Sequence, residues 1–361
     1  MKCLGREWFC RCCFCLGVVL EVRQNAVLDM RKGELRMNIA DIAKMAGVSR
    51  AAVSRYFNNG YISDEKQAAI RKVVEETGYR PSIQAQTLRT KKTKMVGVIV
   101  PKIASSSIGR IVEGMLFEFN KSEYRMILAV TQNEPKKEVE YLDAFNDKQV
   151  DGVILVATVF TAAHKRTLKS MSVPVVIVGQ HLSGYCCVFH DDYHACYDLT
   201  KLLLEKGRTS LGYMSAMLQD KAAGEARYKG FCDAVCDMGR ADLAENVVIA
   251  DFTLASGYEK AGEMLDKCDE LDGLVCATDA MAVGAMQYLR EHDIAVPQTI
   301  LVAGHGDSEI TRMTVPSLIT AHYYYEKSGR LSVRRLLDLL QHDESMAEEV
   351  KLGYEIVDLN G

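Results

Sequence analysis

The pattern of hydrophobic and polar positions changes near residue 94. Before that point apolar residues recur at helical spacing, beginning with Ile39, Ile42 and Ala46, which predicts short amphipathic helices. After it, short apolar runs alternate with stretches of helical periodicity such as 138–148 and 280–292. Continuous apolar strands separated by helices indicate parallel sheets in α/β layers. The predicted strands are 95–100, 125–130, 151–157, 174–178, 187–190, 211–214, 247–250, 273–277 and 301–303. They are too many for one small sheet, so we expect two Rossmann-like lobes.

The helical part has the arrangement of a helix-turn-helix. Gly47 can adopt the left-handed backbone that ends a helix, and Ser49 is suited to cap a second helix over 50–57. A third helix is expected to follow Ser63 and to end at Gly78. In a helix-turn-helix the second helix lies in the major groove of DNA. A generic three-helix bundle with a solvated basic face is the alternative.

The formal net charge of −4 is very unevenly distributed over the 361 residues. Residues 37–94 carry eleven Lys or Arg against five Asp or Glu, a net +6, and residues 1–36 carry a further +3. The remaining residues, 95–361, therefore total −13. A small basic module joined to a large acidic body suggests a negatively charged partner, and nucleic acid is the leading candidate.

Side chains on the predicted second helix supply the chemistry for such a partner. An arginine can bridge guanine O6 and N7 with two hydrogen bonds, while hydroxyl and amide groups suit backbone phosphates. The forward positions, which would face bases, are Arg50, Ala51 and Arg55. The candidate phosphate contacts are Ser49, Ser54 and Asn58.

The runs MNIADIAKMAGVSRAAVSRYFNNGYIS and EETGYRPSIQAQTLRTKKTKMVGVIVP closely resemble the lactose/galactose-repressor family of bacterial transcription regulators, and within it sucrose- or trehalose-type repressors of sugar operons. The resemblance extends from residue 37 to the C-terminus. It implies a small all-α helix-turn-helix domain followed by a two-lobed, periplasmic-binding-protein-like α/β domain. It also implies a cytoplasmic homodimer on a near-palindromic DNA operator, with no membrane attachment, no cofactor and no enzymatic activity. Arg50-Ala51 differs from the tyrosine-glutamine pair of the lactose repressor, which implies a different operator.

The family also implies a hinge helix within residues 81–94. Leu88 matches the leucine that wedges into the minor groove, and Arg89 would contact phosphates together with the neighbouring lysines. An apolar wedge can unstack a base step and bend the duplex. A plain basic linker is the alternative.

The domain boundaries follow from these patterns and from the resemblance. We expect the DNA-binding domain at 37–80, the hinge and linker at 81–94, and the effector-binding and dimerisation domain at 95–361. The chain should cross between the lobes near 191, 321 and 343. The first lobe would then comprise about 95–190 and 322–342, and the second about 191–321 and 343–361. Residues 1–36, whose cysteine cluster has no standard zinc spacing, are expected to be a poorly ordered extension or a wrongly assigned start.

Polar residues near the ends of predicted strands define a candidate effector site. Ligands bind outside the carboxyl ends of such strands, here between the lobes. By the resemblance, Arg227 and Asp279 match the inducer-binding arginine and aspartate of the family, and Tyr325 matches an aromatic residue at a lobe crossing. Gln180 lies where the family often has an acidic residue. A carboxylate and a guanidinium can grip vicinal hydroxyls, so the expected effector is a neutral mono- or disaccharide.

Each of these features has a simpler interpretation. Asp279 could cap a helix that begins at Ala280, Arg227 could be a surface residue, and Asp192 could only cap a helix. The sequence Gly-His-Gly at 304–306 lacks the frame of a dinucleotide-binding loop, and the histidines form no metal-ligand pattern. A transport-type sugar-binding protein is the second functional hypothesis. Whether the effector releases DNA or favours its binding stays open.

Overall fold

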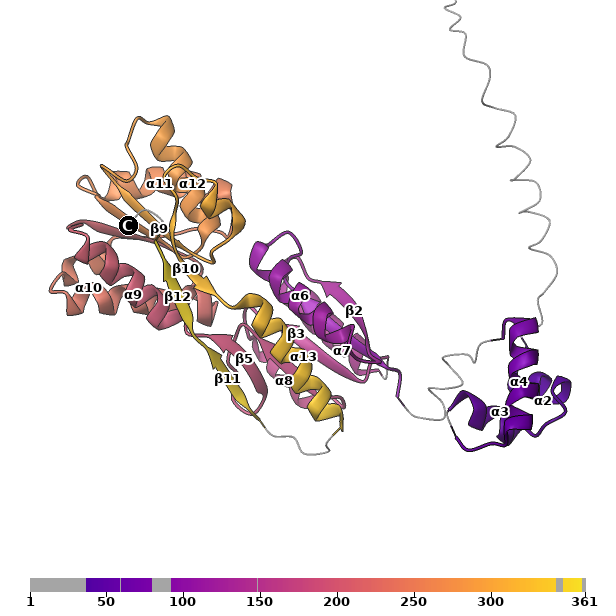
Figure 1. Ribbon diagram of the computed structural model, residues 1–361. Helices are drawn as coiled ribbons and strands as arrows, with labels where there is room; N and C mark the ends of the chain where they lie inside the picture. The colour runs from indigo at the N-terminus through magenta and orange to yellow at the C-terminus, as the bar shows by residue number, and fades with distance from the viewer. Residues whose placement is uncertain (1–36, 59, 80–91, 148, 342–346, 359–361) are drawn as a thin grey trace, which may run out of the picture. The chain divides into compact units, whose positions relative to one another are not determined.

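The computed structural model describes residues 37–58, 60–79, 92–147, 149–341 and 347–358, which fall into two units that divide between Lys91 and Lys92. In the first unit the side chains of Ile42, Val53 and Ile70 are completely buried where three helices meet. These helices are α2 (Ile39–Met45), α3 (Arg50–Phe57) and α4 (Asp64–Thr77), shown in indigo in Figure 1.

The described residues of the second unit form two six-stranded sheets with the same winding order. The first has the order β11-β5-β4-β3-β1-β2 and the second the order β12-β10-β9-β8-β6-β7. Strands of the first sheet are β1 (Met95–Val100), β2 (Arg125–Val130), β3 (Gly152–Val156), β4 (Val175–Val178), β5 (Cys186–His190) and β11 (Glu349–Leu352). Strands of the second are β6 (Leu211–Ser215), β7 (Val247–Ile249), β8 (Gly273–Cys276), β9 (Leu301–His305), β10 (Ile319–Tyr323) and β12 (Tyr354–Val357).

Helices cover both faces of the first sheet. Val98 faces a core that includes Ile111 and Leu336, whereas its neighbour Ile99 faces a second core that includes Leu142. Buried parallel strands need such cover on both sides, which explains their continuous apolar sequences. The helices of this lobe are α6 (Ser106–Phe119), α7 (Pro135–Asn146), α8 (Ala162–Ser170) and α13 (Tyr325–Gln341).

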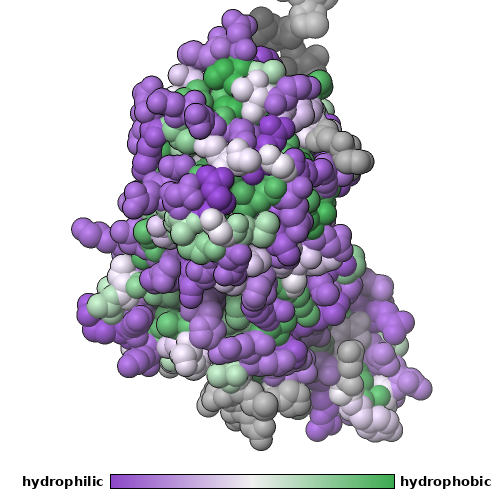
Figure 2. All heavy atoms as spheres, turned by 90° about the vertical axis from the view of Figure 1, so that its left-hand side faces the viewer, coloured by the Kyte–Doolittle hydropathy of each residue, from purple (hydrophilic) through white to green (hydrophobic). Residues whose placement is uncertain are grey.

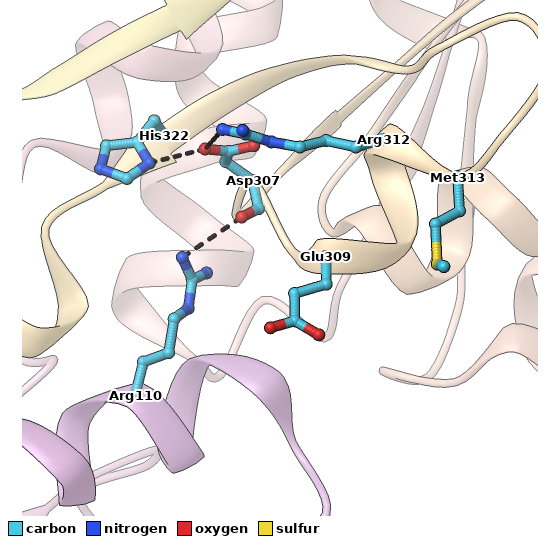
Figure 3. A pocket seen from close by; sticks show the side chains of 6 residues that line it. All are labelled: Arg110, Asp307, Glu309, Arg312, Met313 and His322. Atoms are coloured by element: carbon cyan, nitrogen blue, oxygen red, sulfur yellow. Dashed lines mark hydrogen bonds and ion pairs between the residues drawn. The ribbon is translucent and has the colours of Figure 1, made fainter.

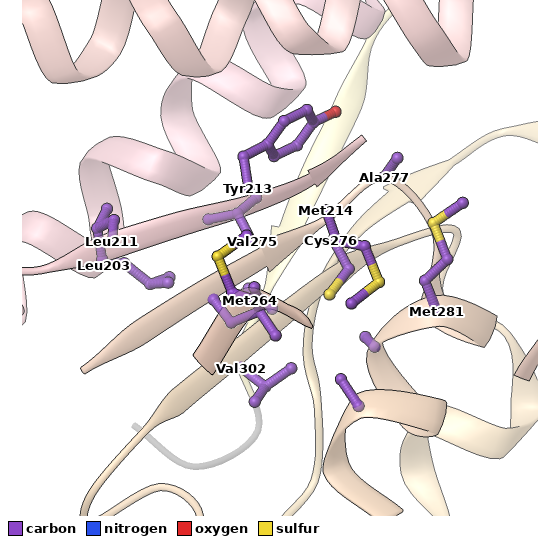
Figure 4. Packing of buried hydrophobic residues seen from close by; sticks show 14 of the residues in the cluster. Leu203, Leu211, Tyr213, Met214, Met264, Val275, Cys276, Ala277, Met281 and Val302 are labelled. Carbon is purple, nitrogen blue, oxygen red and sulfur yellow. The ribbon is translucent and has the colours of Figure 1, made fainter. Parts of the chain in front are cut away.

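The second lobe has the same layered plan. Its core joins Leu211, Tyr213 and Val275 of the sheet to Met264 and Met281 of the covering helices (Figure 4). Helices α9 and α10 pack against each other, as do α11 and α12 (Figure 1). The helices are α9 (Asp192–Glu205), α10 (Arg227–Asp237), α11 (Leu254–Lys267) and α12 (Asp279–Glu291), with short turns η3 (Ala241–Glu245) and η4 (Glu309–Arg312). This architecture confirms the expected fold class.

The chain passes between the lobes at three places, and one differs from the expectation. The first lies at Asp191, between β5 and α9, and the second at Tyr324, between β10 and α13. The third lies at Gly353, not near 343, because β11 pairs with β5 of the first sheet before β12 pairs with β10 of the second. The prediction was wrong here because these two short strands at the sheet margins alternate polar and apolar residues and lack a continuous apolar run.

On the face shown in Figure 2, hydrophobic residues form small patches among predominantly hydrophilic ones. No helix among the described residues is long and apolar enough to span a bilayer.

Candidate DNA-binding face and ligand cleft

Local capping fixes the turn between α2 and α3. Asp41 Oδ2 accepts a hydrogen bond from the Asn38 amide at 2.9 Å, and the Asn38 side chain in turn caps the first amides of α2. Gly47 takes a φ of +66°, which side chains disfavour, and Ser49 Oγ accepts from the Ala52 amide at 3.2 Å. The two caps orient α3 relative to α2.

The proposed base-reading residues lie on one face of α3. Arg50, Ala51 and Arg55 are exposed, whereas Ala52 and Val53 are buried in the three-helix core. A helix with its opposite face held by a small domain can present such side chains to the major groove.

The residues proposed to contact phosphates differ in exposure and in the hydrogen bonds that they already make within the protein. Ser49 is exposed, and because its Oγ accepts the capping bond, its hydroxyl proton is available to a phosphate oxygen. Ser54 is half-buried. Asn58 ends α3 and its side-chain amide donates to the main-chain oxygen of Ser54, so a phosphate contact by Asn58 would compete with that bond.

The predicted hinge and linker lie largely outside the described residues, and so do Leu88, Arg89 and the extension 1–36. The start of the second unit is described, and it is tightly held. The Asp151 carboxylate accepts from the amides of Thr93 and Lys94 at 2.7 and 2.9 Å, and from Thr93 Oγ1 at 2.9 Å. The chain that follows the linker is therefore fixed to the residue that precedes β3.

Arg227 is buried between the lobes, and its carboxylate partner is Asp192 rather than Asp279. Nε donates to Asp192 Oδ1 at 2.8 Å, Nη2 lies 2.6 Å from the same oxygen, and Nη1 donates to the Ala277 carbonyl. The guanidinium lies 5.0 Å from the centroid of the Tyr323 ring. The pair at the cleft wall therefore balances its own charge.

This pairing changes the interpretation of Asp192. Asp191 caps α9, and the buried Asp192 is the first residue of that helix. Although burial acts to lower the pKa of Arg227, the neighbouring Tyr323 and Asp192 raise it well above its usual range. Asp192 therefore holds the guanidinium charged inside the protein, a role that its position in the sequence did not indicate.

Asp279 does not cap its helix. Thr278 caps α12, and Asp279 follows as its first residue. Its Oδ1 accepts from Thr320 Oγ1 at 2.6 Å and its Oδ2 from the Ser308 amide at 2.8 Å. Burial raises the pKa of Asp279, although these bonds oppose the rise. A Cβ on Gly304 would lie 2.8 Å from Oδ1, so the glycines of 304–306 make room for this carboxylate.

Gln180 joins the two lobes. It follows β4, and its Nε2 donates to Asp220 Oδ1 at 2.7 Å across the cleft. Asp220 also accepts from the amides of Ala222 and Ala223, which holds the start of the π-helical turn η2 (Lys221–Ala226) that leads into Arg227. Burial raises the pKa of Asp220. Although Gln180 is not acidic, the second lobe thus brings a carboxyl group beside it.

Tyr325 begins α13 within a cluster of aromatic rings. The His190 ring centroid lies 5.2 Å from those of both Tyr323 and Tyr325, and the His305 ring stacks on Tyr323 at 6.3 Å. Burial raises the pKa of Tyr325 to about 12. His190 and Tyr323 were not among the residues expected at the site from the sequence, although each is the last residue of a strand.

Both histidines are neutral at pH 7 because burial lowers the pKa of His190 to about 4 and that of His305 to about 3. His305 Nδ1 lies 2.8 Å from the Cys276 carbonyl oxygen, which can only accept, so Nδ1 carries the proton and Nε2 is an acceptor. Nε2 of each histidine and the Tyr323 hydroxyl are buried without a hydrogen-bond partner among the described residues. Three unpaired polar groups thus belong to neighbouring rings, because His190 and His305 both lie against Tyr323.

Two hollows share Arg110 and His322 in their lining, and neither is lined by His190 or His305. One, of about 500 Å³, follows Tyr325 along the start of α13. The other, of about 400 Å³, is lined by Arg110, Asp307, Glu309, Arg312, Met313 and His322 (Figure 3). Asp307 Oδ2 lies 2.9 Å from His322 Nδ1 and 3.3 Å from Arg312 Nη2. Within the described residues, no group of three or more His, Cys, Asp or Glu side chains could hold a metal ion.

Comparison with known proteins agrees with this organisation. Residues 38–82 match the bacterial regulatory proteins of the lacI family, and residues 200–358 match the periplasmic binding protein-like domain. The sucrose operon repressor of Staphylococcus xylosus is 30% identical over 305 residues, which are 84% of this chain and 94% of that protein. The lac repressor dimer bound to operator and the anti-inducer ONPF superposes with a TM-score of 0.79 at 21% identity, over 89% of this chain and 98% of its own. The complex of the regulator CelR with cellobiose gives 0.69 at 24% identity, over 90% and 99%.

A helix-turn-helix with an exposed basic face, joined to a two-lobed α/β body, defines a DNA-binding transcription regulator. The chain belongs to the lacI family of bacterial regulatory proteins. The match over the DNA-binding residues argues against a transport-type sugar-binding protein, and the relatives are regulators rather than enzymes.

Proposed function

We propose that the protein represses carbohydrate-utilisation genes and that a sugar bound between the lobes controls its affinity for the operator. The observation that carries the proposal is the convergence of unpaired His190, His305 and Tyr323 groups beside the Arg227–Asp192 pair. Buried polar groups without partners are costly, so such a cluster favours a ligand that supplies them. The sucrose operon repressor among the relatives supports a sugar.

The chemistry of the cleft favours a neutral polyol. Nε2 of His305 accepts hydrogen bonds, which hydroxyl groups can donate, Nε2 of His190 is a further unpaired group, and Asp279 offers carboxylate oxygens. Tyr325 is suited to pack on a sugar ring, and Gln180 with Asp220 would close the cleft opposite it. Because Arg227 is neutralised by Asp192, it leaves no surplus charge for an anionic ligand.

The helix-turn-helix of the first unit indicates how the protein would bind operator DNA. One helix-turn-helix reads a half-site, so the protein should act as a cytoplasmic homodimer on a near-palindromic duplex. Arg50, Ala51 and Arg55 would read bases. Ser49, Ser54, Asn58 and Arg89 would contact phosphates, and Leu88 would wedge into the minor groove.

The test begins with duplexes that the full-length protein selects from a random pool. Its affinity for the selected duplex would then be measured with and without sucrose, trehalose and cellobiose, together with direct calorimetry of each sugar. We expect one sugar to bind and to change DNA affinity, and Asp279→Asn to lose sugar binding while it keeps DNA binding. Asp269→Asn, an exposed aspartate of the same lobe, is the matched control.

Two outcomes would contradict the proposal. Failure to enrich a near-palindromic duplex would argue against operator binding. Undiminished sugar affinity in Asp279→Asn would show that the effector site lies elsewhere. The sign of the DNA effect would separate an inducer from a corepressor.

A further inference from the structure

We infer that Arg110 is a positioning residue that couples occupancy of the cleft to the first lobe. The inference rests on the proposed effector site and names a residue through which that site acts. Away from the chain crossings, two side-chain bridges join the lobes among the described residues: the Gln180–Asp220 bond and a set of bonds from Arg110.

The Arg110 bridge reaches main-chain atoms of the opposite lobe. Arg110 extends from α6 in the first lobe, and its Nη1 donates to the Asp307 carbonyl at 3.2 Å (Figure 3). Its Nη2 donates to the Gly306 carbonyl. A planar guanidinium presents its donors in a rigid fork that fits two adjacent carbonyls, whereas a lysine offers donors from a single nitrogen without that fixed geometry. Because Arg110 binds main-chain oxygens, the bridge depends on the position of the loop 306–308 and not on which side chains that loop carries.

That loop is also held from within its own lobe. Asp307 adopts a φ of +46°, a left-handed conformation that is costly for a non-glycine residue, so surrounding contacts must maintain it. The Ser308 amide donates to Asp279 at 2.8 Å, and the Asp307 side chain is bound by His322 and Arg312. Arg110 at Gly306 and Asp307, and Asp279 at Ser308, thus hold adjacent residues of one loop from opposite lobes.

This arrangement links the ligand to the lobe contact. A sugar hydroxyl that donates to one of the Asp279 oxygens competes for that oxygen with the Ser308 amide or the Thr320 hydroxyl. A change at Ser308 moves the carbonyls of Gly306 and Asp307, to which Arg110 is bound. A ligand can shift the balance between two arrangements of the lobes only if it makes different contacts in each. The exchange of partners at Asp279 provides such a difference.

In the first lobe, helices α6 and α13 pack so closely that we expect them to move together. A Cβ on Gly114 would lie 2.1 Å from the Glu326 carbonyl, and one on Gly329 would lie 2.0 Å from the Ile111 carbonyl, so α6 and α13 are in backbone contact. The Arg110 guanidinium also lies 4.8 Å from the centroid of the Tyr325 ring, at the start of α13. A displacement of Arg110 therefore acts on both helices that cover this face of the sheet.

The test compares arginine variants of the full-length protein that line the same hollow. Arg110→Met removes every donor but keeps an unbranched side chain, and Arg110→Lys restores the charge and a single donor nitrogen without the planar fork. Arg312→Met is the matched control, because it removes the same charge but no contact between the lobes, and the 3.3 Å pair of the exposed Arg312 with Asp307 should contribute little to the loop while His322 still binds Asp307. Thermal melting checks that each variant is folded.

The main measurement is the ratio of DNA affinities with and without the sugar of the panel that acts on the wild type. We expect a wild-type ratio of roughly 5 to 150, the usual range of allosteric coupling, a ratio near 1 for Arg110→Met and an intermediate one for Arg110→Lys. Arg312→Met should keep the wild-type ratio. Without ligand, amide hydrogen exchange over residues 303–308 should be faster in Arg110→Met than in either the wild type or Arg312→Met.

The outcomes separate this inference from the proposed function. A wild type that responds to sugar, with an equal response in Arg110→Met, overturns the role of Arg110 and leaves the proposed function intact. A wild type that responds to none of the three sugars counts against the proposed effector. In that case, amide hydrogen exchange is the measurement that tests the Arg110 bridge. Unchanged exchange at 303–308 in Arg110→Met overturns it in either case.

Discussion

At the scale of single residues, the cleft combines a buried ion pair with neutral acceptors. Arg227 keeps its charge because Asp192 lies against it, whereas His190 and His305 lose theirs because burial lowers the pKa of each imidazole. Hydrogen bonds to neutral imidazole can be exchanged for bonds to a ligand without moving a net charge. The site can thus be buried when the lobes meet and still offer acceptors to hydroxyl groups.

The neutral histidines predict a loss of stability in acid. The pKa of His305 is about 3 in the folded protein against about 6.5 in an unfolded chain, so the unfolded chain takes up the proton first as the pH falls. Between pH 7 and pH 5 this should remove about 2 kcal/mol from the free energy of unfolding, and the loss should continue toward pH 3. Denaturant titrations at several pH values should show a smaller loss in His305→Gln. Parallel pH profiles for the two proteins would contradict the assignment.

On the DNA-binding face, we expect that replacing Arg55 reduces DNA affinity in a sequence-specific way. Arg55→Ala should cost about 1–3 kcal/mol on the selected duplex and relax the preference at one base position in each half-site. Arg71→Ala, an exposed arginine on α4, changes the net charge equally and should weaken binding evenly across sequences, if at all. Binding to a set of single-base variants of the duplex measures both effects. An even loss for Arg55→Ala would remove it from the base-reading set.

At the scale of elements, close packing of helices decides what α6 can do. Gly109 and Gly114 lie on the same helix, but only Gly114 faces another backbone. A helix that carries a bridging side chain at one end must be fixed along its length, and its contact with α13 provides this. The sequence pattern of α6 marks its apolar face and gives no sign of how closely the two backbones approach.

Two alanine substitutions on α6 should therefore have opposite effects. Gly109→Ala meets no atom within 4 Å and should stabilise the helix by roughly 0.5–1 kcal/mol. Gly114→Ala would place its Cβ 2.1 Å from the Glu326 carbonyl and should destabilise the protein by about 1–3 kcal/mol. Thermal unfolding of the two variants beside the wild type tests this. Equal shifts would mean that α6 and α13 are not in backbone contact.

At the scale of the whole molecule, the two lobes repeat one plan but differ in what they are joined to. Asp151 binds Thr93 and Lys94 before β1, and Asp272 binds the amides of Thr209 and Ser210 before β6 at 2.7 and 2.8 Å. Each lobe thus has an aspartate clamp, in which one aspartate (Asp151 or Asp272) binds two main-chain amides just before the first strand of that lobe. Only the clamp of the first lobe also holds the residues that follow the linker.

The repeated clamp supplies its own control. Asp151→Ala and Asp272→Ala should each cost roughly 1–3 kcal/mol in the free energy of unfolding, because each leaves several donors unpaired. Only Asp151→Ala should also reduce the ratio of DNA affinities with and without sugar, while sugar affinity itself is preserved. Calorimetry and DNA titration of both variants measure these quantities. An equal loss of coupling in Asp272→Ala would show that general loosening, and not the linker anchor, is responsible.

The sequence by itself determined the local features. Helical spacing, Gly47 and the cap at Ser49 located α3, and continuous apolar runs located most of the buried strands, because these signals depend on neighbours in the chain. The buried strand β10 was missed because Thr320 and His322 interrupt its apolar residues. The short strands β11 and β12 were missed since they lie at sheet margins without such a run.

The tertiary structure alone decided the partners in the cleft. The alignment of strand ends placed Asp192, not Asp279, against Arg227, and brought Asp220 to Gln180 from the other lobe. Arg110 belongs to the amphipathic pattern of its helix, and nothing near it in the chain indicates the carbonyls that it binds. Such pairings depend on how two separately folded sheets face each other, and periodicity within one segment carries no information about that geometry.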